Sequence, residues 1–253
     1  MKIGLIGFGK TGKAVAMAIL QNNVYCLEWV LKKSASLENR AAPEFLGIES
    51  DDPGHIFSSA STAITTLLHE HPVDIIIDFS SNKGIYTYGR EAADRRITII
   101  SAISHYSEED SRFLENLSES TVVFWSPNIT LGVNYLLFAS KFLKKIAPWV
   151  DIEIVEEHFK AKDGISGTAL KIADALEVDR KEINSVRAGG IVGKHEVIFG
   201  FPYQTVRLIH ESISREAFGN GVLFVAENLL GKPAGLYKFE DILKPYFNSD
   251  ALN

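Results

Sequence analysis

Short apolar runs alternate with helix-like segments over the first half of the chain. The runs that predict strands are 3–6, 26–31, 73–79, 97–100 and 122–125, and helices are expected at 14–20, 83–94 and 108–117. The run at 73–79 is rich in β-branched residues and nearly continuous, as expected for a strand with both faces covered. Strands separated by helices predict right-handed crossovers, and therefore an α/β fold with a Rossmann-type, doubly wound parallel sheet.

The pattern changes in the second half, where a long helix (133–146) and then an alternating strand (151–158) are expected. In that strand Ile152, Ile154 and, as a further candidate, His158 share one face, and the charged residues take the other. The elements expected after it are a helix at 167–176, strands at 185–192, 195–201 and 205–214, and a helical tail at 218–243. This order predicts a second, α+β domain with a mixed or antiparallel sheet.

The length of 253 residues, 46% of them hydrophobic, is enough for two modest cores. The change in pattern predicts a first domain formed by 1–126 and 216–253, and a second domain at 127–215. The net charge is −6, from 26 basic and 32 acidic residues, which argues against a nucleic-acid partner because phosphate binding needs a basic surface.

Two further features concern the cellular location. The single cysteine, Cys26, cannot form a disulfide within the chain, which favours a reducing compartment. No segment approaches the ~18 consecutive apolar residues of a membrane helix, and the apolar run at the N-terminus is too short for a signal peptide. We therefore expect a soluble, cytoplasmic protein without a membrane partner.

A glycine-rich turn follows the first expected strand and opens the first helix. The residues of this turn, which we expect to contact a nucleotide, are Gly7, Phe8, Gly9, Lys10, Thr11 and Gly12. They match G-x-G-x-x-G, in which the glycines allow a tight turn, close approach of a pyrophosphate, and close packing of helix on strand. The helix N-terminus adds unpaired N–H groups for the phosphates. A plain glycine turn is the alternative, but its place in a βαβ unit favours dinucleotide binding.

The end of the second strand indicates which dinucleotide is preferred. An NAD-preferring site usually has an acidic residue there, ~20 residues after the glycines, to bind the ribose 2′-hydroxyl. This chain has Lys32, Lys33 and Ser34 at that point, a group that suits a 2′-phosphate. We therefore expect NADPH to be accepted at least as well as NADH, the alternative being that both lysines are merely solvated.

The densest polar stretch of the chain, 156–168, joins the end of a strand to the start of a helix. Ser166, Gly167 and Thr168 resemble a helix N-cap, whose free N–H groups and hydroxyls suit a carboxylate. His158 can exchange a proton near neutral pH, and Lys162 can hold an anion or supply a proton. A hydrogen-bonded structural histidine is the alternative for His158 alone, but its neighbours favour a catalytic site.

With these residues the chain resembles the 4-hydroxy-tetrahydrodipicolinate reductase (dihydrodipicolinate reductase) family. The signature of this family, approximately E-x-H-H-x-x-K-x-D-x-P-S-G-T, is matched at 156–158, at Lys162 and at 166–168. The resemblance covers essentially the whole chain, and it includes the glycine turn, Asp78-Phe79-Ser80, 128–134, and 214–215 with 218–221.

The resemblance implies NAD(P)H-dependent reduction of a cyclic imine dicarboxylate in the diaminopimelate and lysine pathway. It implies a catalytic role for His158 and Lys162, without deciding which protonates the substrate, and carboxylate binding by Ser166, Gly167 and Thr168. Further cofactor contacts that it implies are Phe79, Ser80, Ser101, Ala102 and Asn128. It also implies a homotetramer assembled through the second domain, which would bind the substrate, while the first domain binds the dinucleotide.

The chain departs from the family pattern in four respects. Phe159 replaces the second histidine, and the loop from Lys162 to Ser166 is one residue shorter, with Ile165 in place of a proline. The segment 101–104 replaces a Gly-Thr-Thr-Gly stretch, which weakens the expected cofactor contacts there. We expect the activity to be retained because the residues with chemical roles are present.

Two other functions remain open at this stage: a different two-domain dehydrogenase, acting on an amino acid or a hydroxy acid, and a nucleotide-sensing protein without turnover. No metal site is expected, because His69 and His71 lie two residues apart and do not share a helix face. The scattered histidines expected to be structural or at the surface are His55, His105, His195 and His210.

Overall fold

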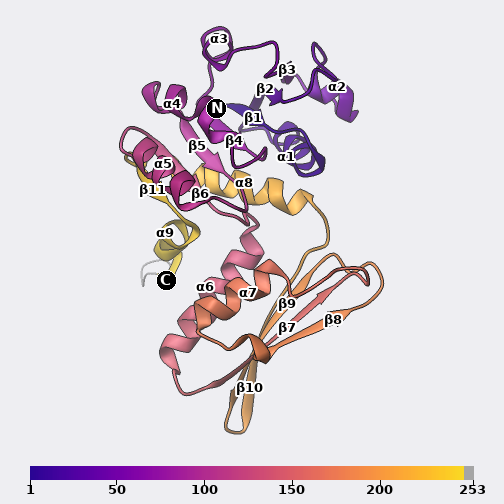
Figure 1. The fold of residues 1–253 in the computed structure, drawn as a ribbon, viewed down its shortest axis with the longest axis vertical. Coiled ribbons are helices and arrows are strands. Elements are labelled where there is room, and N and C mark those ends of the chain that lie inside the picture. Colours follow the sequence, from indigo (N-terminus) through magenta and orange to yellow (C-terminus); the bar gives the residue numbers. More distant parts are fainter. Residues whose placement is uncertain (248–253) are drawn as a thin grey trace. The chain divides into compact units, whose positions relative to one another are not determined.

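The computed structural model describes residues 1–247 and divides them into two compact units (Figure 1). Unit 1 consists of Met1–Ile129 together with the described residues from Phe218 onward, and unit 2 is Thr130–Ala217. The sequence places the corresponding changes at residues 127 and 216. No helix within the described part of the chain is long and apolar enough to cross a membrane.

Unit 1 is built on a parallel sheet that has seven strands within residues 1–247, in the order β11-β6-β5-β4-β1-β2-β3. The strands are β1 (Lys2–Ile6), β2 (Cys26–Lys32), β3 (His55–Ser58), β4 (Ile75–Asp78), β5 (Thr98–Ser101), β6 (Val122–Trp125) and β11 (Gly235–Tyr237). All four residues of β4 are buried, because helices cover both faces of the sheet. The strand order reverses beside β1, and ligands of such sheets bind at that point, outside the carboxyl ends of the strands.

The helices of unit 1 connect these strands, so the predicted doubly wound Rossmann-type fold is confirmed. They are α1 (Lys10–Leu20), α2 (Ala42–Leu46), α3 (Ile64–Glu70), α4 (Ile85–Asp94), α5 (Glu108–Ser118), α8 (Glu216–Leu229) and α9 (Phe239–Leu243), followed by a 3-10 turn at Lys244–Phe247. The sequence pattern missed α2, α3 and β3, and it was wrong to continue the helical tail through β11. That strand has only three residues and gains its conformation by pairing with β6 in the sheet, which no local pattern announces.

Unit 2 has a mixed sheet, as predicted, with the order β10-β9-β7-β8 among its described strands. These are β7 (Asp151–His158), β8 (Ile183–Arg187), β9 (Lys194–Phe201) and β10 (Gln204–Glu211), and the helices are α6 (Leu131–Ile146), α7 (Gly167–Leu176) and a 3-10 turn at Arg180–Glu182. β7 runs parallel to β8 and antiparallel to β9. The core of unit 2 combines Ile154, Val197 and Phe199 of the sheet with Ile172 and Leu176 of α7.

The register of this sheet places a row of polar residues at one end of the helix-covered face. Glu156 on β7 pairs with Ser185 on β8 and with His195 on β9, and His195 pairs with His210 on β10. Partners in register project from the same face, so these side chains are neighbours although they are distant in sequence. The prediction that the charged residues of β7 avoid the core face was wrong for Glu156, which shares that face with Ile154 and is 0% exposed.

Candidate active site

The loop between β7 and α7 ends in a helix cap. The Ser166 side chain accepts a hydrogen bond from the backbone N–H of Ala169 at 3.0 Å, which satisfies a free donor of the first helical turn. Gly167 and Thr168 open the helix, and outside the adjoining residues and the helix's own backbone no atom lies within 4 Å of where a Gly167 Cβ would be. The helix N-cap predicted at Ser166 is therefore confirmed, and a helix start of this kind offers free N–H groups to an anion.

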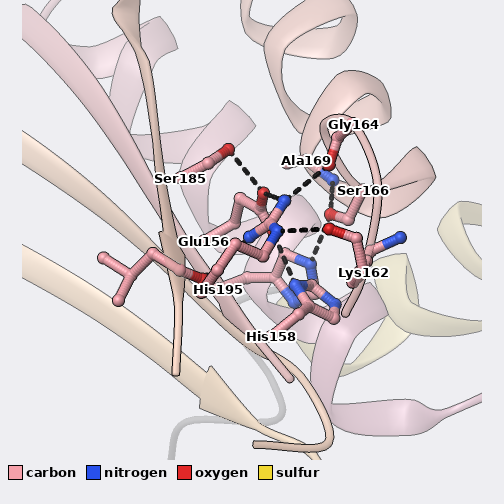
Figure 2. A network of polar contacts seen from close by, with 10 residues as sticks. Glu156, His158, Lys162, Gly164, Ser166, Ala169, Ser185 and His195 are labelled. Atoms are coloured by element: carbon pink, nitrogen blue, oxygen red, sulfur yellow. Dashed lines mark hydrogen bonds and ion pairs between the residues drawn. The ribbon is translucent and has the colours of Figure 1, made fainter. Parts of the chain in front are cut away.

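Glu156 is the centre of the polar network below this cap (Figure 2). One carboxylate oxygen accepts hydrogen bonds from Arg187 and from the Ser185 hydroxyl, and the other pairs with Nδ1 of His158. Burial would raise the pKa of Glu156, but the hydrogen bonds from Arg187, Ser185 and His158 outweigh it and lower the pKa. A buried carboxylate is tolerated here because it remains ionised and fully partnered.

Glu156 also determines the orientation of His158. Because an ionised carboxylate only accepts, Nδ1–H of His158 donates to it and Nε2 is left for other chemistry. The Nε2 side is kept open by Gly193, where a Cβ would lie 3.0 Å from that nitrogen. Burial lowers the pKa of His158; Glu156 opposes this, while the positive charges of Lys162 and Arg187 add to it.

Arg187 joins the network to the loop that carries Lys162. Its Nε donates to the backbone carbonyl of Lys162 at 3.0 Å, and its Nη2 donates to the carbonyl of Gly164 as well as to Glu156. The loop is thus anchored to β8 on one side and to the cap of α7 on the other. The sequence identified Lys162 but assigned no role to Arg187, whose partners are set by strand pairing.

His195 is a second residue whose contacts the sequence did not reveal. It is 5% exposed, and its Nε2 lies 3.0 Å from Ser166 Oγ. Its ring packs edge-on against His158, with centroids 5.4 Å apart. Burial lowers the pKa of His195 to about 4, and the nearby positive charges of His158 and His210 contribute. The only signal in the sequence was that His195 alternates with Val197 and Phe199 on a strand.

In unit 1 the glycine turn has the geometry expected for a nucleotide loop. Gly7 has a φ of +95°, and a Cβ there would lie 2.7 Å from the carbonyl carbon of Phe79. A Cβ on Gly12 would lie 2.0 Å from the Gly7 oxygen, so the helix packs directly on the turn. Around Gly9, in contrast, no atom outside its two chain neighbours lies within 4 Å of a Cβ position. Two glycines are therefore needed for packing, and one faces space that phosphates can occupy.

The residues expected to distinguish NADPH from NADH lie at the end of β2 and directly after it. Nζ of Lys32 donates to both the carbonyl and the hydroxyl of Ser36, each at 2.7 Å, and the Ser36 hydroxyl lies 2.9 Å from that of Ser34. Lys33 is exposed beside them. The turn therefore combines ammonium groups with hydroxyls, a chemistry that fits a phosphate.

Four of the other expected cofactor residues, Phe79, Ser80, Ser101 and Ala102, lie at the carboxyl ends of β4 and β5, and Asn128 follows β6. A pocket of about 440 Å³ there is lined by Thr11, Phe79, Ser80, Ser81, Asn82, Ala102, Ile103, Ser104 and His105. Ser101 is fully buried, bonds the hydroxyl of Tyr106 at 2.8 Å and does not line the pocket. The Asn128 carbonyl accepts from Ser126 at 2.6 Å, close to where the chain passes from unit 1 to unit 2.

The structure therefore gathers the predicted residues into two sets. His158, Lys162 and the 166–168 cap come together within unit 2, and the expected cofactor residues all belong to unit 1. Within residues 1–247 no group of His, Cys, Asp and Glu side chains has a geometry that could hold a metal ion.

In a comparison with known proteins, the two units match the N-terminal and C-terminal models of one protein family. Residues 1–129 match the model described as dihydrodipicolinate reductase, N-terminus, and residues 130–243 match its C-terminus. A 4-hydroxy-tetrahydrodipicolinate reductase of Caldanaerobacter subterraneus subsp. tengcongensis is 38% identical over 193 residues, covering 68% of this chain and 77% of that protein. One from Anaplasma marginale is 29% identical over 269 residues, covering 96% and 100%.

A solved structure shares the fold. Dipicolinate-bound dihydrodipicolinate reductase from Paenisporosarcina sp. TG-14 superposes with a TM-score of 0.79 at 19% identity, covering 95% of this chain and 98% of the other. A probable dehydrogenase from Thermotoga maritima gives a TM-score of 0.66 at 12% identity, covering 100% and 96%. At these identities the likeness shows a shared fold.

Proposed function

The chain belongs to the dihydrodipicolinate reductase family, and we propose that it reduces 4-hydroxy-tetrahydrodipicolinate to tetrahydrodipicolinate in diaminopimelate and lysine biosynthesis. It is an NAD(P)H-dependent oxidoreductase by family. The observation that carries the assignment of the substrate is the network around Glu156, which sets His158 and Lys162 beside the cap of α7. A cyclic imine with two carboxylates needs both an acid and an anion site.

The start of α7 suits one substrate carboxylate. We assign its binding to the Ser166 hydroxyl and to the N–H groups and hydroxyl of Gly167 and Thr168. These donors are preorganised by the helix, and the helix dipole favours a negative charge at this end. Lys162 supplies a positive charge on the adjoining loop, which stabilises the charge that develops during reduction.

The glycine turn and the pocket of 440 Å³ fit a pyridine dinucleotide, because Gly9 leaves open space where Gly7 and Gly12 are tightly packed. When bound, the reduced nicotinamide would supply a hydride, and the overall reduction takes up this hydride and one proton while the 4-hydroxyl of the substrate leaves as water. We assign protonation of the substrate to His158, whose Nε2 becomes a donor when the ring is charged. The Glu156 carboxylate stabilises that charged form, and the two negative charges of the substrate favour it further.

The lysines that end β2 support a preference for NADPH. In this proposal Lys33 and the Lys32–Ser36 group bind the 2′-phosphate, for which NADH has no counterpart. Michaelis constants for the two cofactors test this directly. A preference of tenfold or more for NADH would contradict it.

We also propose a cytoplasmic homotetramer assembled through unit 2. The sheet face opposite the helices carries Val155, Ile198 and Ile209, which alternate with core residues, and Ile209 is 56% exposed. The same face carries the ion pairs Lys194–Glu157 and Arg207–Glu196, so the contact that we propose combines apolar side chains with charged ones. Light scattering coupled to size exclusion tests the subunit number, and a monomer would contradict the proposal.

The experiment that tests the function couples the chain to the enzyme that makes its substrate and follows the loss of reduced nicotinamide absorbance. Turnover of the cyclic imine supports the proposal. Oxidation of an amino acid or a hydroxy acid in its place would indicate another dehydrogenase. Nucleotide binding without any turnover would indicate a sensing protein.

A further inference from the structure

A histidine outside the family signature contacts the proposed carboxylate site from the neighbouring strand. We propose that His195 is a positioning residue: its Nε2–H fixes the Ser166 hydroxyl so that the hydroxyl proton is free to bind a substrate carboxylate. This inference rests on the proposed function, because it assumes that the cap of α7 receives a carboxylate. His195 reaches the cap through the register of β9 with β7, which sets it beside Glu156.

The hydrogen bonds of Ser166 limit where its proton can point. A serine hydroxyl has one proton to donate and two lone pairs that accept. One lone pair accepts from the Ala169 N–H at 3.0 Å, and the remaining protein contact is with Nε2 of His195 at 3.0 Å. If Nε2 carries a proton, the hydroxyl accepts twice and its own proton points to a ligand. If Nε2 is bare, the hydroxyl must donate to it and has nothing left for a carboxylate.

The other ring nitrogen decides between these two arrangements. Nδ1 of His195 is buried, and no residue within 1–247 forms a hydrogen bond with it. A proton on Nδ1 would be an orphaned buried N–H group, which folded proteins rarely contain, whereas a bare acceptor is tolerated more often. The single proton of the neutral ring therefore belongs on Nε2.

The ring is neutral because of its surroundings. It is buried between the rings of His158 and His210, and burial together with those neighbours and Lys162 lowers its pKa, while the Glu156 carboxylate only partly compensates. Its pKa of about 4 leaves it uncharged across the neutral range. The His195 proton is thus held in one place, and the Ser166 hydroxyl is preorganised before substrate arrives.

The variants that test this differ in one donor. His195→Leu removes the N–H at similar volume, whereas His195→Gln returns an amide N–H at the distance of Nε2. We expect His195→Leu to weaken substrate binding about tenfold, seen as a higher KM with a smaller change in kcat, because a hydrogen bond to a charged group loses its orientation. His195→Gln should recover most of the loss. His210→Leu is the matched control, since within the described residues His210 stacks on His195 but forms no hydrogen bond with the Ser166 side chain.

A double-mutant cycle separates positioning from a merely structural role. In a Ser166→Ala background, His195→Leu should change substrate binding by less than about twofold, because the hydroxyl through which it acts is gone. Pyridine-2,6-dicarboxylate, titrated calorimetrically into the protein with saturating NADPH, provides the same comparison without catalysis. Equal effects of His195→Leu in both backgrounds would overturn the inference.

Ring nitrogen chemical shifts of labelled protein give a test without any variant. A proton on Nε2 of His195 is expected, and a proton on Nδ1 would refute the proposal. Failure of the two proposals is distinguishable. Turnover by the wild type with dicarboxylate binding unaffected by His195→Leu would reject the role of His195 alone. Dicarboxylate binding that depends on His195, without turnover of the cyclic imine, would reject the proposed function alone.

Discussion

The two units build their sites from different materials. The nucleotide turn of unit 1 uses the backbone: Gly7 and Gly12 are close-packed, Gly9 leaves open space, and the consecutive positions 7–12 contain the essential features. The site of unit 2 uses side chains that converge from β7, β8, β9 and the cap of α7. A site formed by the backbone of consecutive residues can be recognised from the local sequence. A site formed by side chains of several strands depends on how those strands pair. The two should therefore fail in different ways when they are perturbed.

The largest effect is expected from substitutions that remove the proposed catalytic groups of unit 2 and leave the glycine turn of unit 1 intact. His158→Ala and Lys162→Ala should each lower kcat by ~10²–10³, the usual loss when one preorganised group is removed from such a site. NADPH affinity should stay within about twofold of the wild type, because additivity holds for separate sites. Steady-state kinetics and fluorescence titration of NADPH measure the two quantities. Near-normal turnover in both variants would show that the site is assigned wrongly.

Acid should lower the stability of unit 2 because the buried His195 ring has a lowered pKa. The pKa of His195 is lowered from 6.5 to about 4, so the unfolded chain binds the proton first and the folded state loses stability as the pH falls between these values. The loss amounts to about 3 kcal/mol at pH 4, from ~1.4 kcal/mol per pKa unit. Hydrogen exchange of β9 amides reports this unit. His195→Gln should flatten the pH dependence, and an equally steep profile in that variant would contradict the explanation.

Substitutions in the glycine turn of unit 1 should act by steric crowding, and not by removing a functional group. Gly12→Ala places a methyl 2.0 Å from the Gly7 oxygen, and such overpacking costs about 1–3 kcal/mol, which predicts NADPH binding weakened at least tenfold or a destabilised unit. Gly9→Ala meets no protein atom, so thermal stability should be unchanged while nucleotide binding falls. Calorimetry with and without NADPH separates the two. A Gly12→Ala protein with normal stability and affinity would contradict the packing argument.

The smallest expected effect concerns the choice of cofactor. Lys33→Ala should raise the KM for NADPH about threefold to tenfold, as expected for one exposed charge contact, and leave the KM for NADH unchanged. Lys145→Ala, an exposed lysine in the last turn of α6, is the matched control. Equal changes for both cofactors would place Lys33 outside the 2′-phosphate site.

The elements of the site were predictable from the sequence, but most of its contacts were not. The pattern predicted β7 and α7 with the bounds found, because the alternation at 151–154 and a Ser166 cap are local signals. It did not bring Ser185, Arg187 and His195 to Glu156, since those contacts follow from the pairing of β7 with β8 and β9. The charged residues of this strand were expected on the face opposite Ile152 and Ile154, and this was wrong for Glu156, which is buried beside them. Only the neighbouring strands complete its hydrogen bonds.

Arg187 has a consequence for the length of the loop above it. One guanidinium holds the carbonyls of Lys162 and Gly164 as well as the Glu156 carboxylate. The residue that anchors the loop therefore lies on β8, outside the loop itself. A loop shorter by one residue can keep the same hydrogen bonds to Arg187. The loop that carries Lys162 is thus tied to β8 although it is one residue shorter than the family pattern and has Ile165 in place of the proline. We therefore expect substitutions at 163–165 to leave the hydrogen bonds of Glu156 with His158 and Arg187 in place.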